Sequence, residues 1–368
     1  MAINILKEPH QLYPAYNDSY IKFNGTVSGL PANKAEITIP QFTSPFIIYP
    51  DTIGNFQFNL KEIIKTLFGG GGFEDSTFIP SGFHNIRTDK LIDLDVNISL
   101  QSDAGVFNQY KNYEFLKAVK QVGEKVYDNN LQILSKSNNG IDYSLTYFEG
   151  FEFQYELLKV DEDSTIKVKN LNSGDDVSFA GFESSNTLRL WIDKVNSNLT
   201  TTNILPLSDT INKLEIFEND VFKTNLRLRK KPAECGVYLK WFNNQGGFNY
   251  WLFDKFYQDS TKSKSIGEIT RNSFLNLDET PKSFSYSQGK ETSKTMKLKS
   301  TLKDDEIYYV KDILSSPSVQ LYTSQTPFEK GEWITVNVGG TINESTKRTN
   351  GNEITVTIDL PVQYNITY

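Results

Sequence analysis

Hydrophobic and polar residues alternate along much of this chain, and a period of two predicts β-strands. Residues 91–100 read LIDLDVNISL, with leucine, valine and isoleucine interleaved with aspartate, asparagine and serine. Such a strand buries one face and exposes the other. Similar patterns predict further strands at residues 19–23, 34–39, 145–157, 165–168, 188–192, 213–222, 224–228, 319–322, 332–338, 353–358 and 362–368.

One segment near the N-terminus follows the helical period instead. Within residues 59–68, the apolar residues that fall on one helical face are Leu60, Ile63, Ile64 and Leu67. Four glycines at residues 69–72 end this helix, and the acidic pair Glu74 and Asp75 stands where a phosphate-binding loop requires lysine. The glycine run therefore predicts a flexible loop after the helix.

A second helix is expected at residues 303–315. Ser300 or Thr301 is the expected N-cap, and three acidic residues in the first turns favour the positive end of the helix dipole. A third short helix is expected within residues 113–126. The apolar residues expected on the buried face of the second helix are Ile307, Val310, Ile313 and Leu314.

Residues 236–256 give the strongest local signal, because two aromatic-rich runs flank a polar turn that contains glycine. That pattern predicts a β-hairpin. It carries no plausible catalytic arrangement, so we interpret its aromatic rings as core or subunit contacts, with sugar stacking as the alternative. The residues assigned to this assembly hairpin are Tyr238, Trp241, Asn243, Asn244, Gly246, Gly247, Tyr250 and Trp251.

The pattern as a whole predicts a mainly β protein built from antiparallel β-sandwich or barrel domains, with two or three short accessory helices. We expect an N-terminal domain at residues 1–108, a middle domain at 109–228 and a C-terminal domain at 229–368. Residues 259–295 are polar and weakly patterned, so we expect a long connection or a loose hairpin that a neighbouring subunit could order.

The charge balance narrows the class of partner. Formal net charge is −7, and the single basic cluster, at residues 227–231, alternates with apolar residues like the exposed side of a strand. We therefore expect no specific nucleic-acid binding. The N-terminus has no signal-peptide pattern, and no apolar run is long enough to insert into a membrane.

Candidate catalytic and metal-binding groups are sparse. Cys235 is the only cysteine, and His10 and His84 are the only histidines, which disfavours disulfides, zinc sites and Ser–His or Cys–His catalysis. The acidic runs at residues 161–163 and 175–176 lack the spacing of a calcium loop. We expect no cofactor, no metal and no enzyme activity, although the plentiful carboxylates leave a glycosidase pair open.

Four segments also resemble a known family. Residues 236–253 read GVYLKWFNNQGGFNYWLF, which is similar to the GVYLRWLNNLGGYDYWLF-type segment of structural proteins from tailed bacteriophages and prophages of Bacteroidetes. The start, with Pro9 and PAYN at residues 14–17, resembles their QP…PAYNP opening. Residues 148–153 resemble their YEGYPF segment, and residues 310–336 resemble their LLSSPEVYL…GEWIPVIV unit.

The resemblance implies a β-rich virion protein of the tail, baseplate or neck, similar in role to a distal tail protein. It implies a homo-oligomeric ring that contacts other tail or baseplate proteins, made in the host cytoplasm and incorporated into the virion. The departures, Asp18 and Thr335 where proline is common, lie at positions without chemistry. The alternative function is a carbohydrate-binding or receptor-binding β-sandwich at the tail tip, with a host-surface glycan as partner.

Overall fold

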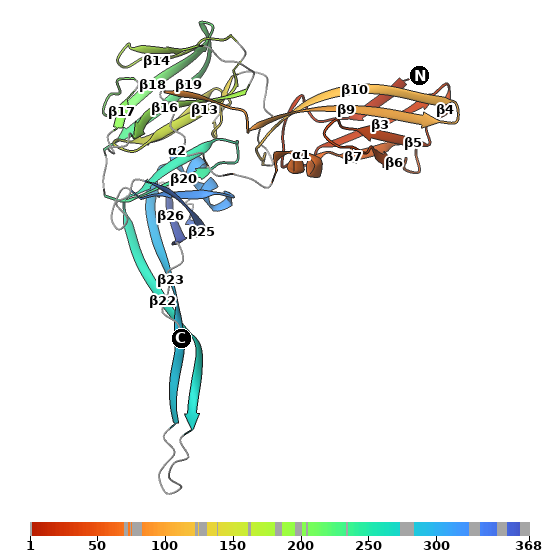
Figure 1. Cartoon of the computed structure of the whole chain (residues 1–368). Coiled ribbons are helices and arrows are strands. Elements are labelled where there is room, and N and C mark those ends of the chain that lie inside the picture. The colour runs from red at the N-terminus through yellow and green to blue at the C-terminus, as the bar shows by residue number, and fades with distance from the viewer. Residues whose placement is uncertain are drawn as a thin grey trace. The chain divides into compact units, whose positions relative to one another are not determined.

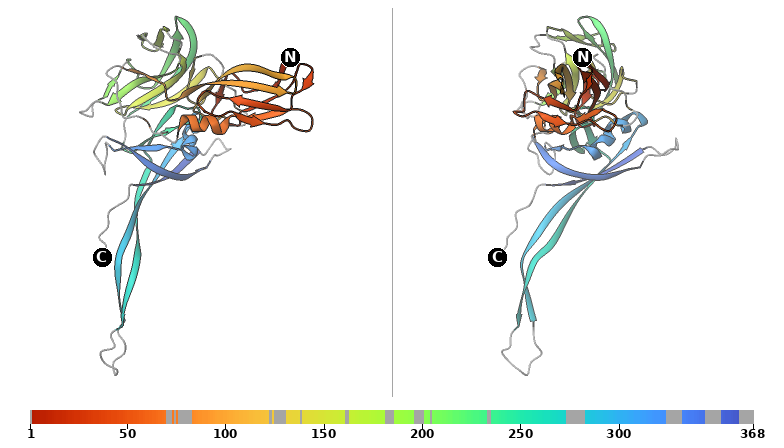
Figure 2. Two further views of the ribbon diagram at one scale, coloured as in Figure 1. Left: turned by 45° about the vertical axis from the view of Figure 1, so that its right-hand side comes forward. Right: turned by 90° about the vertical axis from the view of Figure 1, so that its right-hand side faces the viewer.

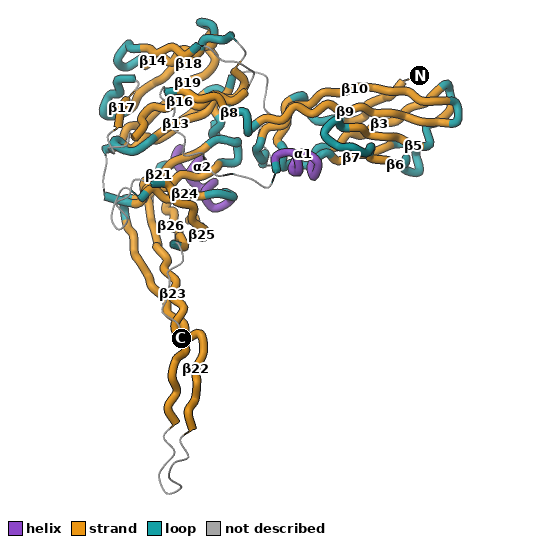
Figure 3. The backbone as a smooth tube through the Cα atoms, viewed as in Figure 1, coloured by secondary structure: helices purple, strands orange, loops and turns teal. Residues whose placement is uncertain are grey.

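The chain folds into a mainly β protein with 61% strand, two α-helices and five sheets in its described part (Figures 1 and 3). By its internal contacts it divides into two compact units, Met1–Pro232 with Phe242–Asn249, and Ala233–Trp241 with Tyr250–Tyr368. The computed structural model describes residues 2–69, 73, 75, 83–121, 124, 131–137, 139–160, 163–180, 186–195, 201–203, 205–232, 235–272, 283–323, 332–343 and 352–360.

The N-terminal part of the first unit is formed by two sheets whose apolar residues share one core. Alternate residues of the long strands point inward, as the period-two pattern requires, and Phe23 stacks on Phe56 at 5.3 Å between ring centroids. The first sheet has the order β1 (Ala2–Lys7), β3 (Tyr20–Val27), β4 (Leu30–Pro31), with β7 (Phe56–Asn59) also paired to β3. The second has the order β2 (Leu12–Pro14), β10 (Gly105–Leu116), β9 (Leu91–Ser102), β5 (Lys34–Thr38), β6 (Phe46–Ile48).

Helix α1 (Lys61–Phe68) adds Ile63 and Ile64 to this core, which confirms the helical period predicted for that segment. It ends at Gly69, whose φ of 71° lies in the region that favours glycine. The rest of the glycine run, residues 70–72, lies outside the described residues.

Two further sheets form the middle part of the first unit. One has the order β11 (Gln132–Ile133), β13 (Phe153–Val160), β16 (Asn186–Val195), β17 (Thr201–Asn203), with β8 (His84–Arg87) also on β16. The other has the order β12 (Asp142–Phe148), β19 (Val221–Lys231), β18 (Ile211–Glu218), β14 (Ile166–Asn170), β15 (Asp176–Phe179).

The fifth sheet contains the aromatic hairpin and the longest strands of the chain. Its order is β21 (Phe248–Phe253), β20 (Val237–Phe242), β24 (Val319–Tyr322), β25 (Trp333–Asn343), β26 (Asn352–Asp359), β23 (Ser283–Leu302), β22 (Phe256–Asn272). Helix α2 (Asp304–Val310) and the 3-10 helix η1 (Lys311–Ser315) follow β23. They occupy the segment predicted as the second helix.

Strands β22 and β23 pair with each other far beyond the point where β23 leaves its other neighbour. Strand β26 pairs with β23 only from Thr295 to Leu302, whereas β22 pairs with it out to Ser283. The two strands therefore continue as a ribbon away from the other strands of their sheet (Figures 1 and 2). The polar segment at residues 259–295, predicted as a long connection or loose hairpin, is this ribbon in its described part.

Several sequence expectations need correction. The mainly β prediction is confirmed, but strands β2 and β12 pair in parallel with β10 and β19, which makes two of the five sheets mixed. Residues 113–116 continue strand β10 instead of starting a helix, because β9 supplies ladder partners through Leu116. Residues 108 and 228, where we placed domain limits, lie within β10 and β19, so each limit divides a strand.

Two local details also differ. Asn219 and Asp220 have φ of 50° and 60° and form a tight turn inside the strand predicted at 213–222. The N-cap of α2 is Lys303, not Ser300 or Thr301, which belong to β23. The strand predicted at residues 362–368 lies outside the described residues.

Candidate functional site

The aromatic residues predicted to mark the assembly hairpin lie in the protein interior. Tyr238, Trp241, Tyr250 and Trp251 are between 0% and 2% exposed. Every residue of β20 and β21 is buried, so both faces of the hairpin are covered within the chain. A ring covered in this way offers no surface on which a sugar can stack. The hairpin is therefore core rather than a sugar platform.

Trp251 links the hairpin to the base of the ribbon and to helix α2. Its indole Nε1–H donates a hydrogen bond of 3.0 Å to Ser300 Oγ on β23. Its ring meets the ring of Tyr309 on α2 edge-on, with 6.0 Å between centroids. A buried Trp N–H group usually finds such a partner, and here the hydrogen bond and the ring contact together hold the indole in one orientation.

A second aromatic group gathers around Trp333 on β25. Tyr238 and Tyr250 stack on each other across β20 and β21, and Tyr322 lies 4.9 Å from Trp333 between centroids. The Lys240 ammonium lies 4.2 Å from the Trp333 ring centroid, which is cation–π distance. These contacts pack the hairpin against β24 and β25.

The turn of the hairpin is organised by Asn243. Its Oδ1 accepts hydrogen bonds from the backbone N–H groups of Gln245 (2.9 Å) and Gly247 (3.0 Å). Its Nδ2 donates to the carbonyl oxygen of Leu134 (2.9 Å) and to Asn249 Oδ1 (2.9 Å). One buried amide thus shapes the turn and attaches it to a segment more than 100 residues earlier in the chain.

Both glycines of the turn are required by geometry. Gly246 has φ of +90°, a conformation that residues with a Cβ rarely adopt. Gly247 lies so close to Leu134 that a Cβ there would overlap the Leu134 carbonyl oxygen. Asn244 contributes its carbonyl oxygen, which accepts a hydrogen bond of 2.8 Å from the Val119 N–H. The turn is therefore fitted closely into the first unit.

A buried cluster of charged side chains lies beside this turn. Lys90 forms an ion pair with Glu156 and donates a hydrogen bond of 2.7 Å to the Gly246 carbonyl oxygen. Arg189 forms a second ion pair with Glu156, with 2.9 Å between Nη2 and Oε1. Lys90 Nζ also lies 4.7 Å from the centroid of the Phe248 ring, a cation–π contact. Lys90, Glu156 and Arg189 are 1%, 2% and 0% exposed. These charges come from three distant segments of the first unit.

The cluster continues through Asp75 to the surface. Asp75 Oδ1 accepts from Arg189 Nη2 at 2.6 Å and from Arg87 Nη1 at 3.0 Å. Arg87 also makes two hydrogen bonds, of 2.8 and 2.7 Å, to the two carboxylate oxygens of Asp89. Three cations therefore alternate with three carboxylates, so most of the buried charge is compensated.

The charges set the protonation of this cluster. Burial lowers the pKa of Lys90 to about 8, although Glu156 opposes the shift. Burial by itself raises the pKa of Glu156, but the charges of Lys90 and Arg189 outweigh it and the net shift is downward. Burial likewise opposes ionisation of Asp89, yet the Arg87 guanidinium outweighs it and lowers the Asp89 pKa to about 2. The downward pKa shifts of Glu156 and Asp89 keep both carboxyl groups ionised at neutral pH.

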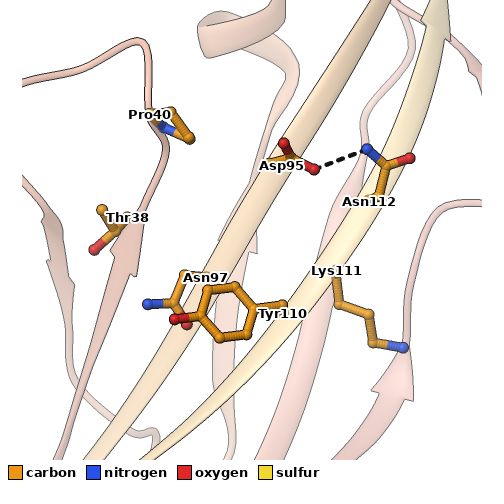
Figure 4. Close-up of a pocket in the computed structure, with 7 residues that line it drawn as sticks. All are labelled: Thr38, Pro40, Asp95, Asn97, Tyr110, Lys111 and Asn112. Atoms are coloured by element: carbon orange, nitrogen blue, oxygen red, sulfur yellow. Dashed lines mark hydrogen bonds between the residues drawn. The ribbon is translucent and has the colours of Figure 1, made fainter.

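A hollow lies on the outer face of the sheet formed by β5, β9 and β10 (Figure 4). It has a volume of about 560 Å³. Tyr110 is 76% exposed there, and Asn112 Nδ2 donates a hydrogen bond of 2.9 Å to Asp95 Oδ1. The other residues that line it are Thr38, Pro40, Asn97 and Lys111.

The described residues contain no group of three or more His, Cys, Asp or Glu side chains arranged to hold a metal ion. Within the same residues, no helix is both long and apolar enough to cross a membrane. Cys235 is exposed and free of disulfide bonds.

The structure brings the predicted hairpin residues together, but it divides them between two environments. The four large aromatic side chains pack in the second unit, whereas Asn243, Asn244, Gly246 and Gly247 belong to the first. The charged cluster was missed by sequence reasoning. One available signal was Arg189, which interrupts the apolar run Leu188–Ile192 in a strand that is buried on both faces.

No family model matches the chain, and no curated protein matches it either. Among solved structures, it is similar to domains 4–9 of the surface layer protein SbsC, with 9% identity and a TM-score of 0.20. That alignment covers 99% of this chain and 44% of the other, so the chain spans less than half the length of that protein. A likeness at this level carries no argument about function.

Proposed function

We propose that the chain is a non-enzymatic structural protein of a phage tail, baseplate or neck, and that it assembles as a homo-oligomeric ring and docks other tail proteins. The observation that carries the proposal is the ribbon formed by β22 and β23. Beyond Lys294, its strands have no other sheet partner among the described residues. A two-stranded hairpin by itself is only marginally stable in water.

The composition of the ribbon supports an assembly role. Ile266 and Ile269 are 55% and 51% exposed, and Tyr257 near the base is 52% exposed. Exposed apolar residues on a strand pair with open edges favour contact with another chain. The aromatic hairpin fits the same role, because it builds a rigid core and presents no catalytic group.

The alternative function, a carbohydrate-binding module, was based on sugar stacking by the aromatic rings of the hairpin, and those rings are buried. Trp241 and Trp251 are buried within the chain, so neither ring can stack on a sugar without local unfolding. The outer face around Tyr110 is one place where a glycan could meet an exposed aromatic ring. No saccharide-specific feature distinguishes that face from a protein contact.

Two measurements test the proposal. Light scattering on the full chain after size-exclusion chromatography should give a discrete multiple of 41.9 kDa. Mass spectrometry of purified phage particles should detect the protein at a copy number consistent with a ring. A monomer at all accessible concentrations, together with absence from particles, would overturn the proposal.

A further inference from the structure

We propose that the lysine-bearing face of the ribbon of one copy docks on the acidic outer face of the β5–β9–β10 sheet of a second copy. This inference deepens the proposed function and rests on it, because it names the surfaces through which the copies associate. Both surfaces lie on described residues, and each belongs to a different compact unit.

The ribbon carries charge opposite to that of the rest of the chain. Residues 256–302 contain eight Lys or Arg and five Asp or Glu, a net charge of +3, in a chain whose formal net charge is −7. The remaining residues therefore carry −10. A basic arm on an acidic protein is attracted to other copies and steers their association.

The positive charge gathers on one face of the ribbon. In an antiparallel pair, side chains of directly opposed residues lie on the same face, and every second pair repeats that face. The pairs Phe256↔Lys299, Gln258↔Lys297, Lys262↔Ser293 and Lys264↔Glu291 share a face by this rule. That face, the lysine face, holds Lys262, Lys264, Lys297 and Lys299, with Glu291 as the one acid contributed by these pairs.

Most of these lysines are available for an intermolecular contact. Lys262, Lys264 and Lys297 are exposed and form no ion pair with any residue the structure describes. Lys299 differs, because it pairs with Glu353 of the neighbouring strand β26 at 2.9 Å. The opposite face holds the 3.0 Å ion pair between Lys294 and Asp259, with Lys290 as one further exposed cation. Exposed lysines without an ion pair therefore number three on the lysine face and one on the opposite face, between Phe256 and Ser265 and their partners.

The outer face of the β5–β9–β10 sheet has complementary charge, and we call it the acidic face. Strand β9 places Asp93 and Asp95 there, opposite Glu114 and Asn112 of β10. Its inner residues, including Leu94 and Val96, are buried in the core, so the alternate residues must point outward. Strand β5 adds Glu36 and its partner Lys34. Acids thus outnumber bases on this face.

The spacing of the charged residues on the lysine face also matches that on the acidic face. Lys262 and Lys264 stand two residues apart on one strand, as do Asp93 and Asp95, and two residues span about 7 Å in a β-strand. The hollow beside Asp95 exposes the Tyr110 ring, over which an ammonium group can lie as a cation–π contact (Figure 4). Because the two surfaces differ, the contact is heterologous and can close a ring.

The ribbon has a built-in bend between its base and its tip. The pairing register shifts on both sides of Gly267, which opposes Gly289 with φ of 151°. A bulge of this kind increases the local twist and re-aims the strands beyond it. The stretch that carries Lys262 and Lys264 lies on the base side of the bend, where its pairing is regular out to Ser265.

Charge reversal with a charge swap tests the docking. The full-length double variants Lys262→Glu/Lys264→Glu and Asp93→Lys/Asp95→Lys should each weaken self-association at least tenfold in sedimentation equilibrium. An equimolar mixture of the two variants should recover association through the swapped charges. The matched control, Lys7→Glu/Lys213→Glu, reverses two exposed lysines outside the ribbon and should associate like the wild type. Circular dichroism confirms that each variant is folded.

The outcomes separate this inference from the proposed function. If the wild type and both variants associate equally, the docking is wrong while a ring-forming role stands. If the wild type stays monomeric, both ideas fail. If the ribbon variant instead loses binding to duplex DNA in a gel-shift assay while its association is unchanged, the lysine face serves nucleic acid and the docking is overturned. Loss in both variants with recovery in the mixture supports it.

Discussion

Lys90 and Glu156 form an ion pair that is buried almost completely, although 66 residues separate them in the sequence. Lys90 also reaches the Gly246 carbonyl oxygen, so one ammonium group joins the segment before β9, strand β13 and the hairpin turn. Because charges of this kind are costly to bury alone, the integrity of the cluster should control the stability of the first unit.

Replacing Lys90 with methionine should destabilise the first unit by about 3–5 kcal/mol, because Glu156 keeps its burial and loses one of its cations. Urea denaturation followed by tryptophan fluorescence measures the change. The control is Lys34→Met, which breaks the more exposed pair with Glu36 and should cost about 0–1 kcal/mol. Equal effects of the two substitutions would contradict a stabilising role for the cluster.

Gly247→Ala should destabilise the protein by about 1–3 kcal/mol, because the new Cβ overlaps the Leu134 carbonyl oxygen and overpacks the turn. Gly339→Ala is the matched control, since a Cβ at that position in β25 has open space around it. We expect that control to change stability by less than about 1 kcal/mol. Differential scanning calorimetry of both variants decides the point, and unchanged melting of the Gly247 variant would show that the turn can relax.

Trp241→Ala should lower the free energy of unfolding by about 3–5 kcal/mol. Trp241 is 0% exposed, so the substitution removes a large aromatic ring from a core. Thermal melting monitored by circular dichroism measures it. Tyr49→Ala removes an aromatic ring that is 71% exposed and should alter stability by at most about 0.5 kcal/mol. A fully stable Trp241 variant would argue against the core role of the hairpin.

Acid should destabilise the first unit through its carboxylates. Asp89 has its pKa lowered from 3.8 to about 2, mainly because Arg87 outweighs the effect of burial. A carboxyl group with a lowered folded pKa stabilises fully above its unfolded pKa, and that contribution is lost as pH falls from about 4 to about 2. The pKa of Glu156 is also lowered, from 4.5, so its contribution begins to fall near pH 4.5.

Melting temperatures measured between pH 7 and pH 2 check this dependence. The Asp89→Asn variant should lose less stability over the lowest part of the range than the wild type does. Asp103→Asn, a substitution in the exposed turn between β9 and β10, is the control and should follow the wild-type curve. A wild-type curve without acid destabilisation would refute the assignment.

Local patterns predicted local structure well. The period of two along residues 91–100 gave a strand because its inward residues meet a core, and the period of 3.6 at residues 59–68 gave α1. The glycine turn at Gly246 and Gly247 marked the hairpin correctly, because positive φ and close approach are properties that glycine supplies locally.

Contacts between distant segments were not accessible in the same way. The pairing of Lys90 with Glu156 depends on how β13 and the segment before β9 meet, which no spacing rule encodes. Residues 113–116 read as helix because their propensity is ambiguous, and the ladder with β9 decided for strand. The length of the ribbon could not be predicted from the sequence. Its faces pack on no core, so its apolar and polar residues do not alternate as they do in a half-buried strand.

Placing the hairpin turn in the first unit has a consequence for synthesis on the ribosome. The ammonium of Lys90 is made 156 residues before the Gly246 carbonyl that it binds, an interval of roughly 8–30 s at ordinary elongation rates. Until then the nascent chain has made Glu156 and Arg189 but lacks the turn and the Phe248 ring beside them. Completion of the first unit therefore waits for translation to pass residue 249, after Ala233–Trp241 of the second unit have been made.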